Sequence, residues 1–325
     1  MPSEFELIAR YFARPTPGAV LGPGDDCALI APSPGCELAI TTDMLVEGTH
    51  FLPDTEPEAL GWKTLAVNLS DLAAMGAMPR WVLLAGSLPN ADENWIAAFA
   101  RGFFALAQQH GVDVIGGDTT RGPRNFCVTA IGEVPAGPAL RRDAAKAGDE
   151  LWVSGTPGRA GLGLQHLLGK LMLTGALRYD CLSALHRPQP RLALGLTLRG
   201  VASAAIDVSD GLLGDLTHIL ERSGLVAELE PDCLPTLLPA SERASSELLN
   251  AARRAQLGGG DDYELIFAVP PAKRRAVEKI ASELGLPLTC FGRLKAGADG
   301  VPPITLRDAN GAPLTIEATG YDHFA

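Results

Sequence analysis

Short acidic segments, most of them beside glycine, threonine or serine, are the part of this sequence best suited to chemistry. They are Gly24-Asp25-Asp26, Thr41-Thr42-Asp43, Ser70-Asp71, Gly116-Gly117-Asp118-Thr119-Thr120, Asp207-Val208-Ser209-Asp210-Gly211 and Gly259-Gly260-Asp261-Asp262. Taken alone, each is explained by a turn or a helix cap, because Gly-Asp pairs form turns and Ser or Asp often precedes a helix. Asp71 and Asp207 fit that explanation less well, since both lie among apolar residues, where a carboxylate needs a partner.

The chemistry open to these aspartates depends on whether they meet in one place. Two carboxylates about 4 Å apart repel by roughly 4 kcal/mol at an effective dielectric constant of about 20, so a cluster of them takes up protons or binds cations. Carboxylate and threonine oxygens suit Mg²⁺, and no cluster of His or Cys competes for a softer metal. ATP phosphates would complete such a site, with backbone N–H groups of a Gly116-Gly117 loop as further phosphate donors.

The common nucleotide-binding motifs are absent. The segment closest to a P-loop runs from Gly163 to Leu171, with five residues instead of four between its glycines and Leu where Ser or Thr must meet the metal. The H-R-D and D-F-G motifs of protein kinases are missing as well. Any nucleotide site therefore has to be built from the acidic segments.

The hydrophobic pattern predicts the elements that carry these segments. Asn68 and Asp71 fall on a predicted helix over 57–74, and Asp43 follows a predicted strand over 37–42 that leads into a loop through His50. Asp207 lies in a predicted strand over 204–208, at the end where α/β proteins gather ligands. Further strands are predicted over 27–31, 81–88, 112–115, 126–134, 151–154, 226–229, 265–269 and 289–293, and further helices over 5–12, 92–110, 159–173, 190–199, 211–223, 241–254 and 272–284.

A linker rich in Pro, Gly and charge at 135–149 predicts two domains, over residues 1–136 and 149–325. Strands and helices alternate beyond it, so we expect an α/β second domain beside an α+β first domain. The length of 325 residues fits two domains.

Composition excludes several classes of function. Lys and Arg number 27 against 38 Asp and Glu, and a formal net charge of −11 argues against binding to duplex nucleic acid. No apolar stretch is long enough for a membrane helix. The acidic start and the absence of a C-x-x-C pair predict a cytoplasmic protein whose six cysteines are mostly reduced thiols.

Seven motifs together closely resemble the thiamine-monophosphate kinase family, in the order that the family has them. They are G-P-G-D-D-C-A-L, T-T-D-M-L-V-E-G-T-H-F, A-V-N-L-S-D-L-A-A-M-G-A, G-G-D-T-T-R-G-P, I-D-V-S-D-G-L, G-G-x-D-Y-E-L and the terminal G-Y-D-H-F. The resemblance implies the fold of the aminoimidazole-ribotide-synthetase superfamily: an N-terminal mixed sheet with helices that forms half of a barrel in a homodimer, and a C-terminal α/β sandwich. It also implies ATP-dependent phosphorylation of thiamine monophosphate to thiamine diphosphate, with several Mg²⁺ ions.

The same resemblance implies a role for individual residues. Asp26, Thr41, Thr42, Asp43, Asp71, Asp118, Asp207 and Asp210 are similar to the family's metal ligands, and of these Asp43, Asp71, Asp118 and Asp210 would be catalytic. Gly117, Asp118, Arg142 and Ser209 are similar to its ATP contacts. His50 resembles the thiamine-phosphate contact, although a lone His in a loop is more often solvated or structural.

Two departures from the family pattern fall in the expected acceptor subsite. Asp261 stands where the family usually has Glu, which is one methylene longer, and Ala318 replaces an aromatic residue on which thiamine rings could stack. Two alternatives stay open: another ATP-using enzyme of the superfamily, or a sensor that binds thiamine phosphate or a nucleotide without transfer. Ala318 is the residue that favours the sensor.

Overall fold

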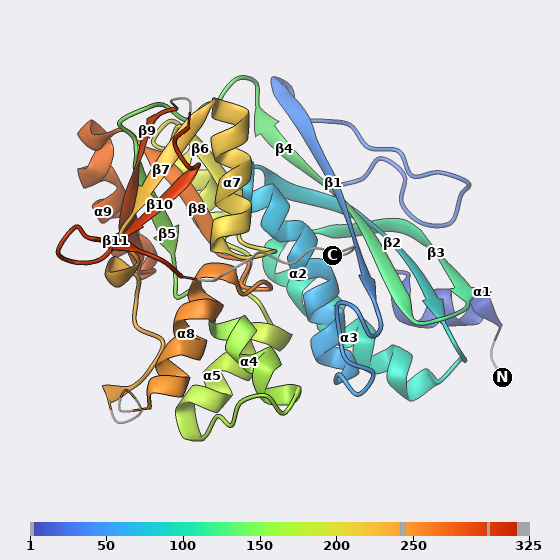
Figure 1. Ribbon diagram of the computed structural model, residues 1–325. Helices are drawn as coiled ribbons and strands as arrows, with labels where there is room; N and C mark the ends of the chain where they lie inside the picture. The colour runs from blue at the N-terminus through green and yellow to red at the C-terminus, as the bar shows by residue number, and fades with distance from the viewer. Residues whose placement is uncertain (1–2, 241–242, 244, 298–299, 317–325) are drawn as a thin grey trace. The chain divides into compact units, whose positions relative to one another are not determined.

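The computed structural model describes residues 3–240, 243, 245–297 and 300–316, and it divides the chain into two compact units (Figure 1). Unit 1 comprises residues 1–72 and 77–137, and unit 2 comprises residues 73–76 and 138–325. Among the described residues, no helix has the length and apolar character needed to cross a bilayer.

Unit 1 is a mixed sheet with two long helices on one face. Its elements are α1 (Glu4–Leu7), η1 (Ile8–Phe12), β1 (Cys36–Val46), α2 (Pro57–Ala74, whose last two residues group with unit 2), β2 (Met78–Leu88), α3 (Glu93–His110), β3 (Asp113–Arg121) and β4 (Asn125–Pro135). In the described part of the chain the strand order is β1-β4-β2-β3, with β2 and β3 parallel and the other pairs antiparallel. The opening helix has a capping box, because Ser3 N–H donates to Glu6 Oε2 at 2.7 Å and Glu6 N–H to Ser3 Oγ at 3.3 Å.

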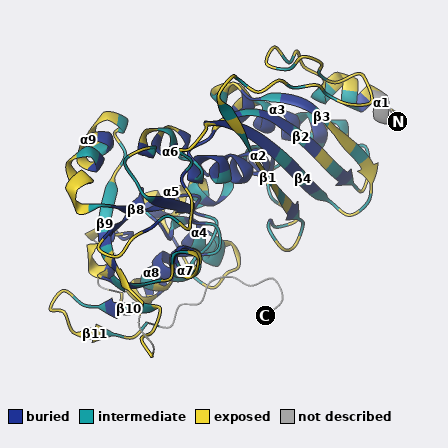
Figure 2. Cartoon of the chain, turned by 90° about the horizontal axis from the view of Figure 1, so that it is seen from above, coloured by how far each residue is buried: buried dark blue, intermediate teal, exposed yellow. Residues whose placement is uncertain are grey.

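The core of unit 1 lies between the sheet and helices α2 and α3. Phe126 on β4 stacks against Phe99 of α3 with ring centroids 4.3 Å apart. The two helices approach so closely that a Cβ on Gly61 would lie 2.0 Å from the Phe99 carbonyl oxygen, and one on Gly102 would lie 1.7 Å from the Glu58 carbonyl oxygen. Glycine at both positions therefore allows α2 to pack deeply, and Figure 2 shows α2 largely in the colour of buried residues.

Unit 2 contains a second, larger sheet and more helices. Its elements are β5 (Glu150–Ser154), α4 (Arg159–Leu167), α5 (Gly175–His186), α6 (Leu192–Leu198), β6 (Ala204–Asp207), α7 (Leu212–Ser223), β7 (Leu225–Leu229), η2 (Pro231–Cys233), α8 (Ser246–Gly258), β8 (Leu265–Val269), η4 (Pro271–Lys273), α9 (Arg274–Leu284), β9 (Leu288–Ala296), β10 (Ile304–Arg307) and β11 (Pro313–Leu314). Over the described residues the strand order is β11-β10-β7-β9-β5-β8-β6.

Two apolar clusters hold unit 2 together. Leu212, Leu216 and Ile219 of α7 pack on Val153 and Ile206 of the sheet, while α9 lies on the other side of the sheet (Figure 1). Helices α4, α5 and α8 form a separate helical cluster through residues such as Leu162, Cys181 and Ala255.

The two-domain α+β and α/β prediction is confirmed, but three local predictions were wrong. Residues 27–31 form no strand, and only an isolated bridge joins Leu29 to Leu21. The helix predicted over 159–173 ends at Leu167, and α5, which the hydrophobic pattern did not indicate, follows it. The expected Gly116-Gly117 loop is part of strand β3.

Candidate active site

In unit 1, side chains from β1 and α2 meet at the face of the sheet that the helices cover. Thr41 Oγ1 donates a hydrogen bond to Asp71 Oδ2, and Asp43 N–H donates to Asn68 Oδ1 at 2.9 Å. Thr41 and Asp43 alternate along the strand, and Asn68 and Asp71 lie one helical turn apart, so each pair shares a face of its element. The structure therefore brings Thr41, Asp43 and Asp71 together, with a polar partner for the Asp71 carboxylate and for the Asp43 backbone.

Thr42 and Asp118 lie on the opposite face of the same sheet. Thr42 pairs with Thr129 across β4, and Asp118 pairs with Ala85 of β2, whose partner on β4 is Cys127. Because β1 and β3 are at opposite edges of the described sheet, three strand spacings of about 4.8 Å, or about 14 Å, separate the strands that carry them. The predicted metal ligands of unit 1 are thus divided between two faces.

The segment around Gly117 is an edge strand rather than a phosphate-binding loop. Leu83 pairs with Gly116 and Leu84 with Gly117 in the parallel ladder of β2 and β3. Gly117 has φ +155°, and a Cβ there would lie 1.8 Å from the Leu84 carbonyl oxygen. Close approach of the two backbones explains this glycine, and Asp118 directly after it is exposed.

Two further predicted residues of unit 1 lie in loops. His50 Nδ1 accepts the backbone N–H of Val46 at 3.0 Å, so the neutral ring carries its proton on Nε2. Asp26 is exposed, and its N–H donates to Asp25 Oδ1 at 2.8 Å.

In unit 2, the segment Asp207–Gly211 lies directly beside the segment Gly259–Glu264. Asp261 N–H donates to the Ser209 carbonyl oxygen and Tyr263 N–H to the Val208 carbonyl oxygen, both at 2.8 Å. Asp207, at the end of β6, is buried, whereas Asp210 and Asp261 are half-buried. The metal, ATP and acceptor residues predicted on these two segments are therefore brought together.

Asp215, which sequence analysis did not single out, supports this arrangement. Its Oδ2 accepts the backbone N–H groups of Ser209, Asp210 and Gly211 at 3.0, 3.1 and 3.1 Å. Burial raises the pKa of Asp215 to about 7, against the opposing effect of these hydrogen bonds. The only sequence signal was its position four residues after Gly211, in the first turn of α7.

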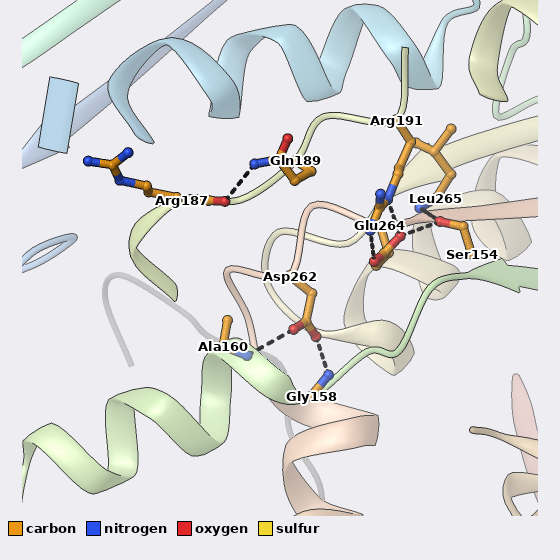
Figure 3. A network of polar contacts seen from close by, with 9 residues as sticks. All are labelled: Ser154, Gly158, Ala160, Arg187, Gln189, Arg191, Asp262, Glu264 and Leu265. Carbon is orange, nitrogen blue, oxygen red and sulfur yellow. Dashed lines mark hydrogen bonds and ion pairs between the residues drawn. The ribbon is translucent and has the colours of Figure 1, made fainter. Parts of the chain in front are cut away.

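Asp262 and Glu264 anchor residues 259–264, the acceptor segment, so called after the acceptor role expected of Asp261, to neighbouring parts of unit 2 (Figure 3). Asp262 caps α4, because its two carboxylate oxygens accept the N–H groups of Gly158 and Ala160. Glu264 accepts two hydrogen bonds from the Arg191 guanidinium and one from the Ser154 hydroxyl, and its exposed fraction is 6%. Asp261 and Tyr263 have positive φ, 67° and 50°, so the residue directly before each of these anchors is conformationally strained.

Two predicted residues of unit 2 remain, Arg142 and Ala318. Arg142 is exposed, and its carbonyl oxygen accepts the Ser223 hydroxyl at 2.8 Å. Ala318 lies outside the described residues. Within the described ranges, no three or more His, Cys, Asp or Glu side chains are close enough together to hold a metal ion. The donors that do meet are carboxylate and hydroxyl oxygens, which fit Mg²⁺ chemically.

The fold and these acidic segments define a protein related to aminoimidazole-ribotide (AIR) synthase. The family model described as "AIR synthase related protein, N-terminal domain" matches residues 24–134, and that of the C-terminal domain matches residues 146–302. Together they cover most of the chain.

Full-length relatives specify the family further. The thiamine-monophosphate kinase of Salmonella typhimurium is 46% identical over 99% of this chain and 98% of its own. A crystal structure of thiamine-monophosphate kinase from Stenotrophomonas maltophilia is 46% identical, with a TM-score of 0.82 over 93% of this chain and 94% of its own. AaThiL complexed with AMPPCP and TMP is 29% identical, with a TM-score of 0.75 over 90% of this chain and 89% of its own. The chain belongs to the thiamine-monophosphate kinase family, and it is an enzyme of the phosphotransferase class.

Proposed function

We propose that the chain transfers the γ-phosphoryl group of ATP directly to the phosphate of thiamine monophosphate, giving thiamine diphosphate and ADP. The observation that carries this proposal is 46% identity to a thiamine-monophosphate kinase over essentially the whole of both chains. The structure of AaThiL with AMPPCP and TMP adds support, because that related protein binds an ATP analogue and TMP.

Each unit would provide part of the metal, ATP and acceptor contacts. In unit 1, the expected acceptor contact is His50, and the expected metal ligands and ATP contacts are Asp26, Thr41, Thr42, Asp43, Asp71, Gly117 and Asp118. In unit 2, the acceptor residues would be Asp261 and Ala318, and the metal ligands and ATP contacts would be Arg142, Asp207, Ser209 and Asp210. The hydrogen bonds from the Thr41 hydroxyl to Asp71 and from the Asp43 N–H to Asn68 support this assignment, because they fix the Asp71 carboxylate and the Asp43 backbone, both half-buried, before any ligand binds.

The proposed transfer needs no general base. The second pKa of a phosphate monoester is about 6, so the acceptor oxygen is largely ionised at neutral pH. That oxygen forms a bond to the γ-phosphorus while the bond from the γ-phosphorus to the β–γ bridging oxygen breaks, and the electron pair leaves with ADP. The main barrier is the approach of two anions, so the chain's residues must align them and shield their charges.

The carboxylate and hydroxyl donors of both units would hold Mg²⁺, which when bound neutralises phosphate charge and orients the phosphates for in-line attack. The Arg142 guanidinium would supply a further positive charge, and its planar fork of N–H donors can bond two phosphate oxygens at once.

A homodimer joined through unit 1 is part of the proposal. Ile40 and Met44 on β1 are 64% and 52% exposed and lie on the same face of the sheet as Thr42. An apolar strand face of this kind fits a second copy of the same sheet better than water. Replacing Ile40 and Met44 by Glu should convert a dimer to a monomer in light scattering, and an unchanged mass would contradict this interface.

We also place the reaction in the cytoplasm. None of the six cysteines, all of them described, forms a disulfide, which fits a reducing compartment.

The decisive test is to incubate the purified chain with ATP, Mg²⁺ and thiamine monophosphate and to identify the products by mass. We expect thiamine diphosphate and ADP in equal amounts, and no product when EDTA is present. ATP consumption that depends on a different acceptor would favour another enzyme of the superfamily. Tight binding of thiamine monophosphate without thiamine diphosphate would favour a sensor.

A further inference from the structure

The turn before α7 uses all its backbone donors internally. The N–H groups of Ser209, Asp210 and Gly211 converge on one oxygen of Asp215, and the exposed fraction of Asp215 is only 3%. A helix N-terminus usually offers such N–H groups to an anionic ligand. In this chain a carboxylate of the same helix already accepts the N–H groups of the turn that precedes it.

Two carbonyl groups of the same turn also have hydrogen-bond partners. The Val208 and Ser209 carbonyl oxygens accept N–H groups from Tyr263 and Asp261. A Cβ on Gly260 would lie 2.4 Å from the Ser209 carbonyl oxygen, so the acceptor segment lies directly on the turn. Since its N–H groups and these carbonyl groups already have partners, the side chains of Ser209 and Asp210 are the groups of the turn best placed to contact a ligand.

We infer that Asp215 is a positioning residue that closes the turn 208–211 to free phosphate and leaves Ser209 and Asp210 to contact a cation-bound polyphosphate through their side chains. The inference deepens the proposed function and rests on it for the identity of the nucleotide. A purely structural role for Asp215 predicts no new binding. The inferred role predicts that removal of the Asp215 carboxylate exposes three N–H groups that bind anions.

Two substitutions separate the parts of this role. Asp215→Asn keeps one side-chain oxygen, and because a single oxygen accepts all three N–H groups, the turn keeps its acceptor. Asp215→Ala removes the acceptor. Asp180→Ala, on the exposed surface of α5 in the same unit, is the matched control.

The kinetic experiment measures kcat and KM for MgATP and thiamine monophosphate in each variant. We expect Asp215→Ala to lower kcat by about 100-fold, because a small displacement of ligand-bearing groups has effects of that size. Asp215→Asn should retain kcat to within about 10-fold, since a neutral acceptor makes weaker hydrogen bonds than a charged one. Equal loss in both variants, or an unchanged kcat in Asp215→Ala, would overturn the inference.

The binding experiment measures the affinity for inorganic pyrophosphate by calorimetry, in the presence of EDTA. We expect Asp215→Ala to bind pyrophosphate more tightly than the unaltered chain and the Asp180→Ala control, because its three N–H groups are released. No gain in affinity would overturn the inference. This measurement does not require turnover, so it stays informative even if the unaltered chain makes no thiamine diphosphate and the proposed function fails.

A measurement on the unaltered chain covers the case in which Asp215→Ala does not fold. Amide hydrogen exchange over residues 209–211 should be slow, and pyrophosphate in EDTA should leave it unchanged. Increased protection of these amides by pyrophosphate would show that they are open to phosphate, and the inference would be wrong.

Discussion

Arg191 and Glu264 form a two-pronged ion pair at the inner end of the acceptor segment. Arg191 Nε donates to Glu264 Oε2 at 2.6 Å and Nη2 donates to Oε1, while the Ser154 hydroxyl donates to Oε2 at 2.5 Å. Glu264 is buried and a quarter of the Arg191 side chain is exposed. The pair joins the start of β8 to the segment before α6 (Figure 3), so the strained residues Asp261 and Tyr263 precede a rigid anchor.

Glu264→Gln should lower the free energy of unfolding by about 3 kcal/mol, because it leaves the Arg191 charge without its partner in a largely buried place. Urea denaturation monitored by tryptophan fluorescence measures the change. The control is Glu283→Gln, which breaks an exposed pair with Lys279 at 3.4 Å and should cost at most about 0.5 kcal/mol. Similar losses in the two variants would contradict the anchoring role of Glu264.

Asp262→Asn should destabilise unit 2 by about 2 kcal/mol. Each Asp262 oxygen accepts a different N–H, so the amide of Asn would place its NH₂ group against one of the two donors. Asp92→Asn is a matched control: a single Asp92 oxygen accepts both capping N–H groups of α3, and Asn is an equally good cap. The melting temperature should fall for Asp262→Asn alone, and an equal fall for Asp92→Asn would count against this account.

Asp71→Asn should abolish turnover without unfolding the chain. The amide keeps an oxygen that can accept the Thr41 hydroxyl, but it removes the negative charge expected to bind Mg²⁺. Asp54→Asn, at an exposed position in the same unit, should leave turnover unchanged. Activity and circular dichroism should be measured together, and near-normal turnover in both Asp71→Asn and Asp43→Asn would refute the metal role of this cluster.

Asp261→Glu should change KM for thiamine monophosphate more than KM for ATP, because the side chain lies on the segment assigned to the acceptor. It should also lower stability by about 1 kcal/mol, because Asp tolerates the left-handed backbone at φ 67° better than Glu does. Steady-state kinetics and thermal unfolding test the two effects separately. Equal changes in both KM values would remove Asp261 from the acceptor subsite.

Stability should fall as the pH is lowered through the titration of His110. Burial lowers the pKa of His110 below its usual 6.5, so the unfolded chain binds more protons between the folded and unfolded pKa values. The contribution of neutral His110 is therefore complete above pH 6.5 and is lost as the pH falls toward the folded pKa. The difference in unfolding free energy between the unaltered chain and His110→Gln should be larger at pH 7.5 than at pH 5, and a constant difference would contradict the shift.

Local patterns were sufficient for elements whose signals are contained in a few neighbouring residues. The helix predicted over 92–110 is confirmed as α3, because Asp92 accepts two N–H groups at its start and Gly111, with φ 63°, ends it. The strand predicted over 27–31 and the Gly116-Gly117 loop were wrong for the opposite reason. Whether an apolar or glycine-rich run forms a strand depends on the partner strand beside it, and in the described structure Gly117 has β2 as its partner.

The amino-acid sequence by itself determined the family, the two-domain fold and the residue types available for phosphoryl transfer, because these are encoded in motifs of a few adjacent residues. Tertiary structure alone decided which of these residues meet. Thr41 and Asp71 are 30 positions apart in the chain yet share a hydrogen bond, whereas Thr42 is turned to the other face of the sheet by the alternation of a strand. Asp215 acquired its role in the same way, since only the folded turn directs three N–H groups to one oxygen.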